Sequence, residues 1–305
     1  MPHAAPAVPT PRADWSGRAG ELGRRARAAA RQLAVAGAGA KGGALRAMAE
    51  NLRARTDDIL EANAEDLAAA RKAGLSAAMI DRLELTRDRI EKMARSVEEI
   101  ADLRDPVGEV LEGYVRPNGL RIERVRVPLG VVLAIYESRP NVTSDVAALC
   151  LKSGNAAILR GGKEALRSNL AVHRALAEAL AGCDLPADAV QMVDNPDHDL
   201  LAALLREDTL IDVAIPRGGE ALIRAVAEQS RIPVIKHYKG VCHVYVDDLA
   251  DLDMAEAICV NAKVQRPGVC NAMETLLVHK HVAARFLPRI CRRLTEAGVE
   301  LRGCK

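Results

Sequence analysis

One segment sets the architecture of this 305-residue chain: Val127-Pro-Leu-Gly-Val-Val-Leu-Ala-Ile-Tyr-Glu-Ser-Arg-Pro-Asn-Val-Thr143. The unbroken apolar run at 131–136 is typical of a strand that is buried on both faces of a parallel sheet. Pro140 then bends the chain, and Asn141 lies at or near the start of a helix. The segment therefore predicts a strand, a tight turn and a helix in succession.

Short apolar runs continue to alternate with helical patterns beyond this segment. Strands are expected at 131–136, 156–160, 190–193, 211–215, 234–235, 243–246 and 275–278. Helices are expected near 142–151, 164–181, 198–206, 219–229, 253–264 and 281–297. This alternation predicts an α/β fold with a mostly parallel sheet, whose ligands bind outside the carboxyl ends of the strands.

The region before the sheet is predicted to be helical over residues 16–104, because apolar residues recur there at three- and four-residue steps. Thr56 and Thr86 are expected to be N-caps. The glycines at 37, 39, 42 and 43 are expected to mark a break between two helices. No strand precedes them, so they are not interpreted as a phosphate loop.

Two other segments of the first half have a distinct character. Residues 107–127 alternate in polarity around Pro117-Asn118-Gly119, which predicts a β-hairpin, and we expect this arm to be an oligomer contact. Residues 1–15 are rich in Pro and Ala and are expected to be a disordered tail.

Composition narrows the class of protein. Hydrophobic residues make up 49% of the chain and charged residues 28%, as in a soluble globular protein. The net charge of +2 argues against nucleic acid or an anionic membrane surface as a partner, and no apolar run approaches the length of a membrane span. The seven cysteines are scattered and include no CxxC pair, which argues against a disulfide framework or a structural zinc site and favours the cytoplasm.

A cysteine in the last quarter of the chain is a candidate nucleophile. Cys270 follows the Pro267-Gly268 break after a helical run and precedes a strand pattern, so we expect its thiol in a loop between two regular elements. Thiolates are strong nucleophiles, and catalytic groups are common on such loops. The alternative is a small buried side chain, and spacing alone leaves both open.

Two strand-to-helix turns combine paired glycines with cations, Arg160-Gly161-Gly162-Lys163 and Pro216-Arg217-Gly218-Gly219. Backbone N–H groups at a helix start favour a pyrophosphate, although paired glycines also serve as simple turn residues. Asn141 likewise has two interpretations, an N-cap or an amide donor to an oxyanion.

The opening segment, the segment Leu151-Lys-Ser-Gly-Asn-Ala-Ala-Ile-Leu-Arg-Gly-Gly-Lys-Glu164 and the Cys270 loop together closely resemble the γ-glutamyl phosphate reductases. These glutamate-5-semialdehyde dehydrogenases are a branch of the aldehyde dehydrogenase superfamily. The resemblance implies NADPH-dependent reduction of L-glutamyl 5-phosphate to glutamate 5-semialdehyde with release of phosphate, the second step of proline biosynthesis from glutamate. It also implies an aldehyde dehydrogenase-like fold, with an NADP-binding domain at 16–252 (α/β core 128–252) and an incomplete catalytic domain at 253–305.

The resemblance implies roles for individual residues. Cys270 would displace phosphate and form a thioester, and Asn141 with the Cys270 backbone N–H would stabilise the oxyanion. Arg160 would meet the adenosine ribose, and Lys163 would suit a 2′-phosphate, which favours NADPH. The turns at Gly161-Gly162 and at Arg217-Gly218-Gly219 would lie along the cofactor phosphates.

Two arginines and one further segment bear on the substrate and the thioester. Arg139 and Arg266 would meet the acyl phosphate or a carboxylate, with surface ion pairing as the alternative. The segment Lys236-His-Tyr-Lys-Gly240 has no Glu where hydrolytic relatives place a general base, which suits a thioester that must survive until hydride arrives.

The end of the chain departs from the family pattern. Family members continue well beyond residue 305, so a C-terminal truncation is expected, and with it an incomplete substrate pocket. An acylating aldehyde dehydrogenase of another semialdehyde and an inactive nucleotide-binding fragment or interaction module therefore stay as alternatives. The expected partners are the glutamyl phosphate substrate, glutamate 5-kinase as its supplier, and further copies of the chain in a homo-oligomer.

Overall fold

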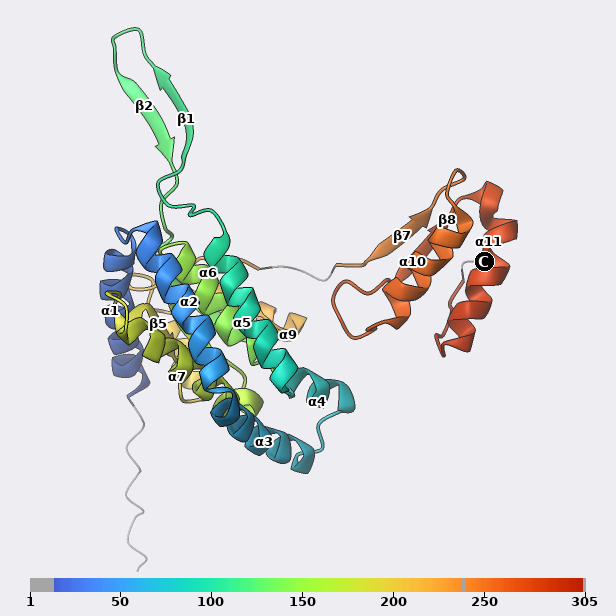
Figure 1. Ribbon diagram of the computed structural model, residues 1–305, viewed down its shortest axis with the longest axis horizontal. Coiled ribbons are helices and arrows are strands. Elements are labelled where there is room, and N and C mark those ends of the chain that lie inside the picture. The colour runs from blue at the N-terminus through green and yellow to red at the C-terminus, as the bar shows by residue number, and fades with distance from the viewer. Residues whose placement is uncertain (1–13, 237–239, 304–305) are drawn as a thin grey trace, which may run out of the picture. The chain divides into compact units, whose positions relative to one another are not determined.

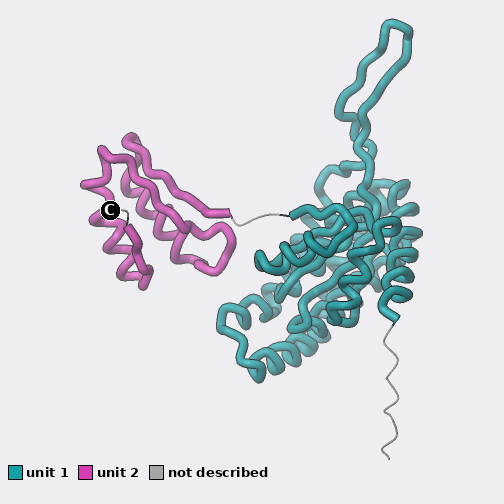
Figure 2. The backbone as a smooth tube through the Cα atoms, turned by 180° about the vertical axis from the view of Figure 1, so that it is seen from behind, with its two compact units in different colours: residues 1–237 teal, residues 238–305 magenta. Residues whose placement is uncertain are grey.

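The computed structural model describes residues 14–236 and 240–303. They belong to two compact units, residues 1–237 and 238–305, coloured teal and magenta in Figure 2. Most of the predicted tail, residues 1–13, lies outside the described residues. Helix α1 begins at Trp15, inside the predicted tail, because the Asp14 carboxylate accepts a hydrogen bond from the Gly17 N–H (2.8 Å) and caps it.

Five helices open the first unit, as predicted for residues 16–104: α1 (Trp15–Leu33), α2 (Ala38–Ala54), α3 (Thr56–Lys72), α4 (Ala77–Leu83) and α5 (Arg87–Asp102). Thr86 caps α5 by accepting from the Arg89 N–H (3.2 Å). The N-cap prediction for Thr56 is wrong, because this residue is already helical and its hydroxyl donates to the Leu52 and Arg53 carbonyls. The helix break lies at 34–37, and the glycines at 39, 42 and 43 are inside α2.

The predicted parallel sheet forms the centre of this unit. It contains β3 (Val131–Tyr136), β4 (Ala156–Arg160), β5 (Val190–Met192) and β6 (Val213–Arg217) in the order β5-β4-β3-β6, all parallel. The helices that follow the strands are α6 (Asn141–Lys152), α7 (Leu166–Ala181), α8 (His198–Leu204) and α9 (Glu220–Gln229), and short 3₁₀ turns occupy Lys163–Ala165 and Ala187–Ala189. Every residue of β3 is buried, as its unbroken apolar run predicted. Helix α1 packs on β3, β4 and β5, whereas α6 packs against α2 and α5, and α7 packs against α2 and α3 (Figure 1).

Two predicted strands differ in detail. β6 is displaced by two residues from the predicted 211–215, and it includes Pro216, which is tolerated because β6 is an edge strand. The predicted strand 234–235 is only an isolated bridge between Val234 and Ala214.

The predicted hairpin projects from the rest of the first unit (Figure 1). Strands β1 (Val110–Val115) and β2 (Arg121–Val125) pair antiparallel, and Gly119 closes the turn with a φ of +85° that favours glycine. Every residue of β1 is exposed, several large apolar side chains among them.

The second unit contains β7 (His243–Val246), α10 (Leu252–Val264), β8 (Thr275–Val278) and α11 (Lys280–Glu296). β7 pairs parallel with β8, and its Val246 packs in a small core with Cys259 and Phe286. Because β7 pairs with β8, it belongs to the second unit, which begins after residue 237. The domain boundary predicted after residue 252 concerns the domains of the family and stays a prediction. Within the described residues, no helix has both the length and the apolar character that a membrane crossing needs.

Candidate active site

The carboxyl ends of three adjacent strands bring the two glycine turns to one edge of the sheet. β3 lies between β4 and β6, with Ile135 opposite Arg160 and Tyr136 opposite Arg217. The turns that begin at Gly161 and at Gly218 therefore flank the segment after β3. This is the edge at which ligands of open α/β sheets bind.

Glu137, directly after β3, occupies the start of α9. Its Oε2 accepts a hydrogen bond from the Gly219 N–H (3.1 Å), a donor in the turn that is predicted to bind a pyrophosphate. Gly218 is required beside it, because a Cβ there would lie 2.6 Å from Glu137 Cδ. Sequence reasoning missed this contact, since it joins a residue after one strand to the turn after its neighbour. The only signal was an acid directly after a buried strand.

The Gly161-Gly162 turn is packed against polar side chains. A Cβ on Gly161 would overlap the side-chain nitrogen of Asn169, and one on Gly162 would overlap the Glu164 carboxylate. Glu164 in turn accepts hydrogen bonds from the Ser138 backbone N–H (3.2 Å) and hydroxyl. Packing alone therefore accounts for both glycines, and neither has the positive φ for which a turn would need glycine. It does not conflict with a ligand above the turn.

Arg160 and Lys163 stand at opposite ends of this turn and differ in exposure. Arg160 is 7% exposed, and its Nη2 donates to the Pro196 carbonyl (2.7 Å), while its buried Nε has no hydrogen-bond partner among the described residues. Burial lowers the pKa of Arg160, and the nearby Glu164 charge partly opposes this. Lys163 is exposed. A buried cation with an unused donor, next to an exposed cation, suits an anionic or hydroxyl-rich ligand.

Asn141 is the first residue of α6, and Pro140 takes the N-cap position. The N-cap interpretation of Asn141 is therefore wrong. Its amide Nδ2 instead donates to Asp145 Oδ2 (3.1 Å), one turn along the helix. Burial raises the pKa of Asp145, and hydrogen bonds from Asn141 and Ser96 oppose the rise. The amide itself is exposed at the sheet edge.

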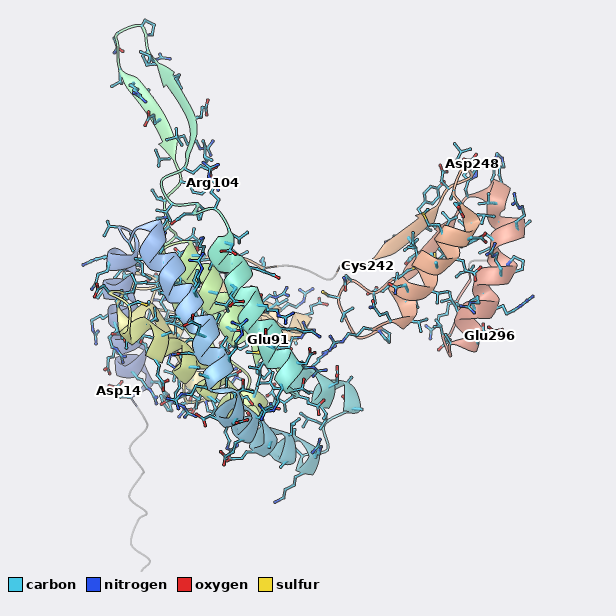
Figure 3. The ribbon with its side chains drawn as sticks, in the orientation of Figure 1. Asp14, Glu91, Arg104, Cys242, Asp248 and Glu296 are labelled. Carbon is cyan, nitrogen blue, oxygen red and sulfur yellow. The ribbon has the colours of Figure 1, made fainter. Side chains whose placement is uncertain are left out.

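In the second unit, the Cys270 thiol is exposed in a loop of turns between α10 and β8. The buried-side-chain alternative is therefore wrong for Cys270. It does hold for Cys150 and Cys259, whose burial raises the pKa of both thiols, that of Cys150 to about 12. The half-buried Cys242, labelled in Figure 3, directs its Sγ at the Cys270 carbonyl oxygen (3.3 Å). The loop thus carries an accessible thiol with a second thiol against its main chain.

The structure adds less to the remaining predicted positions. Arg139 is half-buried in the turn before Pro140, and Arg266 is exposed in the Cys270 loop. Of the segment 236–240, which has no Glu to serve as a general base, residues 237–239 lie outside the described residues.

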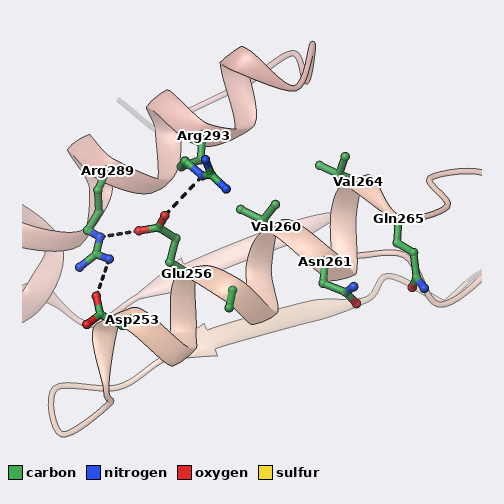
Figure 4. A pocket seen from close by; sticks show the side chains of 9 residues that line it. Asp253, Glu256, Val260, Asn261, Val264, Gln265, Arg289 and Arg293 are labelled. Atoms are coloured by element: carbon green, nitrogen blue, oxygen red, sulfur yellow. Dashed lines mark hydrogen bonds and ion pairs between the residues drawn. The ribbon is translucent and has the colours of Figure 1, made fainter.

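A groove of about 530 Å³ lies on the second unit between α10 and α11 (Figure 4). Arg289 pairs there with Asp253 (2.6 Å) and with Glu256, and Arg293 pairs with Glu256 (3.5 Å). Because these charges neutralise one another, the groove is the surface of a helix–helix ion-pair network. No predicted site residue lines it.

Comparison with known proteins gives consistent matches. Residues 16–301 match the model of the aldehyde dehydrogenase family. The gamma-glutamyl phosphate reductase of Nitratidesulfovibrio vulgaris is 57% identical over 284 residues, 93% of this chain and 68% of that protein. An Anaeromyxobacter protein of the same name is 56% identical over 94% of this chain and 68% of its own. The crystal structure of gamma-glutamyl phosphate reductase from Thermotoga maritima matches with a TM-score of 0.87 and 44% identity, over 94% of this chain and 69% of that one.

Proposed function

Because the chain belongs to the aldehyde dehydrogenase family, and to its γ-glutamyl phosphate reductase branch, we propose that it catalyses the NADPH-dependent reduction of L-glutamyl 5-phosphate to L-glutamate 5-semialdehyde with release of phosphate. The observation that carries the proposal is the exposed thiol of Cys270 on its loop of turns. The reaction is the second step of proline biosynthesis from glutamate, and we place it in the cytoplasm.

Cys270 begins the reaction. Its thiolate attacks the acyl carbonyl carbon, the carbon–oxygen bond to phosphate breaks, and a thioester remains on the sulfur. The Asn141 amide and the Cys270 backbone N–H donate to the carbonyl oxygen while it carries negative charge. The thioester is the group that hydride from a bound nicotinamide would reduce, and release of the aldehyde would break the carbon–sulfur bond and return the Cys270 thiolate.

The sheet edge of the first unit supplies the residues that would hold the nicotinamide cofactor, whose chemistry is the delivery of hydride. Arg160 offers its unused Nε–H, and the exposed Lys163 ammonium suits the 2′-phosphate that distinguishes NADPH from NADH. The Gly218-Gly219 turn, with Arg217 before it, and the Gly161-Gly162 turn offer backbone close to the phosphates. Arg139 and Arg266 are proposed to meet the substrate's phosphate or carboxylate.

The hairpin is proposed to join copies of this chain in a homo-oligomer. Val110, Tyr114, Val115 and Val125 are among its exposed apolar side chains, and an isolated two-stranded arm is marginal without a surface to pack on. Glutamate 5-kinase is the proposed supplier of the unstable acyl phosphate.

The test runs the reaction in reverse, since the semialdehyde is easier to handle than the acyl phosphate. The purified chain is given glutamate 5-semialdehyde, NADP⁺ and phosphate, and NADPH is followed by absorbance. We expect NADPH formation that requires phosphate and is abolished in Cys270→Ala. Formation that requires coenzyme A instead of phosphate, or that survives Cys270→Ala, would contradict the proposal, as would a folded chain without turnover. Lys163→Glu tests the cofactor, since it should shift the preference from NADP⁺ toward NAD⁺.

A further inference from the structure

Cys242 and Cys270 are adjacent in the second unit although they are far apart in the sequence. The Cys242 Sγ lies 3.3 Å from the Cys270 carbonyl oxygen, to which the thiol donates. The Cys242 carbonyl accepts from the N–H groups of Glu274 (2.9 Å) and Thr275 (3.1 Å), where the Cys270 loop enters β8. Two backbone hydrogen bonds and one sulfur contact therefore hold Cys242 against the base of this loop.

The Cys270 loop, residues 265–274, has no regular secondary structure. Cys270 is exposed and lies in turns and bends, whereas Cys242 directly precedes β7, whose ladder with β8 begins at His243 and Thr275. A disulfide requires its two Cα atoms about 4.4–6.8 Å apart. A link would form by rotation of the Cys270 side chain toward the Cys242 sulfur, which already contacts the Cys270 main chain.

The other described cysteines of this unit differ from this pair. Cys259 is fully buried in the small core, and burial raises the pKa of its thiol, which makes it a poor nucleophile. Cys291 is half-buried and packs against the same core from α11. Only for Cys242 and Cys270 does the described structure show a sulfur directed at the other residue.

We propose that Cys242 and Cys270 form a dithiol pair that hydrogen peroxide closes to a disulfide. The Cys270 thiolate attacks one peroxide oxygen, the O–O bond breaks, and the products are a sulfenic acid on Cys270 and water. The Cys242 thiolate then attacks the Cys270 sulfur, the S–S bond forms, the S–O bond breaks, and a second water leaves. Two thiols are oxidised and one peroxide is reduced to two waters.

The pair protects the exposed thiol from irreversible damage. A sulfenic acid without a neighbouring thiol is oxidised further to a sulfinic acid, whereas a disulfide is restored by a thiol reductant. While the disulfide is present, Cys270 has no thiolate for the acyl transfer proposed above. This consequence rests on the proposed function, but formation of the disulfide does not.

Mass spectrometry of the whole chain tests the proposal without an activity assay. The reduced protein is treated with hydrogen peroxide, residual thiols are blocked with iodoacetamide, and the chain is digested with trypsin and Asp-N without reduction. These enzymes separate Cys242, on peptide 240–246, from Cys259, and leave Cys270 on peptide 264–280. We expect these two peptides to be linked, with a mass about 2 Da below the sum of the two reduced, unblocked peptides. Dithiothreitol should reverse the change.

Two serine variants complete the test. In Cys242→Ser the link should be lost and peptide 264–280 should become about 32 Da heavier as Cys270 reaches the sulfinic acid. Cys291→Ser is the matched control, because it removes a half-buried thiol of the same unit and should leave the link intact. The proposal is overturned if wild-type Cys270 gains oxygen without linking, or if it links equally well in Cys242→Ser. Either result leaves the reductase assay unaffected, so the two proposals fail separately.

Discussion

The side-chain amide of Asn141 donates a hydrogen bond to the Asp145 carboxylate across 3.1 Å, one turn along α6. A carboxylate only accepts hydrogen bonds, so Asp145 fixes which end of the amide faces it. The second N–H of the same nitrogen then has a defined direction at the exposed sheet edge. Asp145 is thus placed to orient the Asn141 amide, which is proposed to donate a hydrogen bond to the oxyanion.

We expect Asp145→Asn to lower kcat by about 10- to 100-fold with little change in KM, because an amide at 145 accepts or donates and no longer fixes Asn141. Steady-state kinetics in the semialdehyde assay measure both constants. Asn141→Ala should remove the same contribution, so the double variant should be no slower than Asn141→Ala alone. Additive losses would show that Asp145 acts independently of the amide.

The same pair gives a pH dependence. Burial raises the pKa of Asp145 above its ordinary value, and hydrogen bonds from Asn141 and Ser96 limit the rise. As pH falls through this raised pKa, Asp145 becomes protonated, can donate to the amide oxygen, and no longer holds the amide in one orientation. We expect an acid limb in the kcat–pH profile that is absent in Asp145→Asn. An identical limb in both proteins would assign it to another group.

Glu137 offers a second test at the sheet edge. Its carboxylate holds the Gly219 N–H at the start of α9, where a cofactor phosphate would gain from the same donor. Glu137→Gln keeps the shape and removes a full negative charge, so we expect the Kd for NADPH to fall several-fold in fluorescence titrations at low salt, with the difference shrinking as salt is added. Glu220→Gln, in the first turn of the same helix, is the matched control for general charge effects. A Kd unchanged by Glu137→Gln would place the phosphates elsewhere.

The sequence predicted features that depend on local pattern and missed those that depend on neighbours in space. The apolar run at 131–136 was sufficient to identify a buried parallel strand, and the alternation around it gave the sheet. Thr56 and Thr86 carry the same capping signal, yet only Thr86 follows extended backbone. Between α2 and α3 the chain has only Arg55, so Thr56 never leaves the helical conformation.

The candidate site divides in the same way. The glycine turns and the Cys270 loop were visible in the sequence because glycine, proline and cysteine have distinctive chemistry. The contacts of Glu137 with Gly219 and of Cys242 with Cys270 were not, because each depends on which strands become neighbours. Asn141 is not an N-cap, because Pro140 occupies the N-cap position of α6. The Asn141 amide donates to Asp145 instead.

A buried ion pair links the helical layer to the base of the hairpin. Lys41 is fully buried and pairs with Asp105 (2.8 Å), whose side chain is 15% exposed. Burial alone would raise the pKa of Asp105, but the hydrogen bonds from Lys41 and the Val107 N–H, with the charges of Lys41 and Lys152, hold it below its ordinary value. Lys41→Met should lower the free energy of unfolding by about 3 kcal/mol in urea titrations, because it leaves a largely buried carboxylate without its partner.

The exposed pair of Arg46, on the same helix as Lys41, and Asp102, at the end of α5, is the control (2.9 Å). Arg46→Ala should cost less than about 1 kcal/mol. Because the pKa of Asp105 is lowered by folding, its stabilisation is complete above its unfolded pKa and is lost as pH falls through its folded pKa. Lys41→Met should therefore flatten the acid side of the stability–pH curve, and a loss that is equal at acid and neutral pH would contradict this explanation.

Substituting Ala at two glycines distinguishes the cost of glycine's backbone freedom from the need for space around its backbone. Gly43 lies exposed inside α2 with open space where a Cβ would be, so Gly43→Ala should raise the free energy of unfolding by about 0.5–1 kcal/mol. A Cβ on Gly161 would overlap the buried Asn169 amide and lie 3.2 Å from the Tyr136 ring, so Gly161→Ala should destabilise the fold by about 1–3 kcal/mol. Urea titrations of both variants measure the free energy of unfolding, which should rise in Gly43→Ala and fall in Gly161→Ala. If Gly161→Ala were neutral, the turn after β4 would have room above its backbone, and the close packing of its glycines would no longer explain why the chain uses them there.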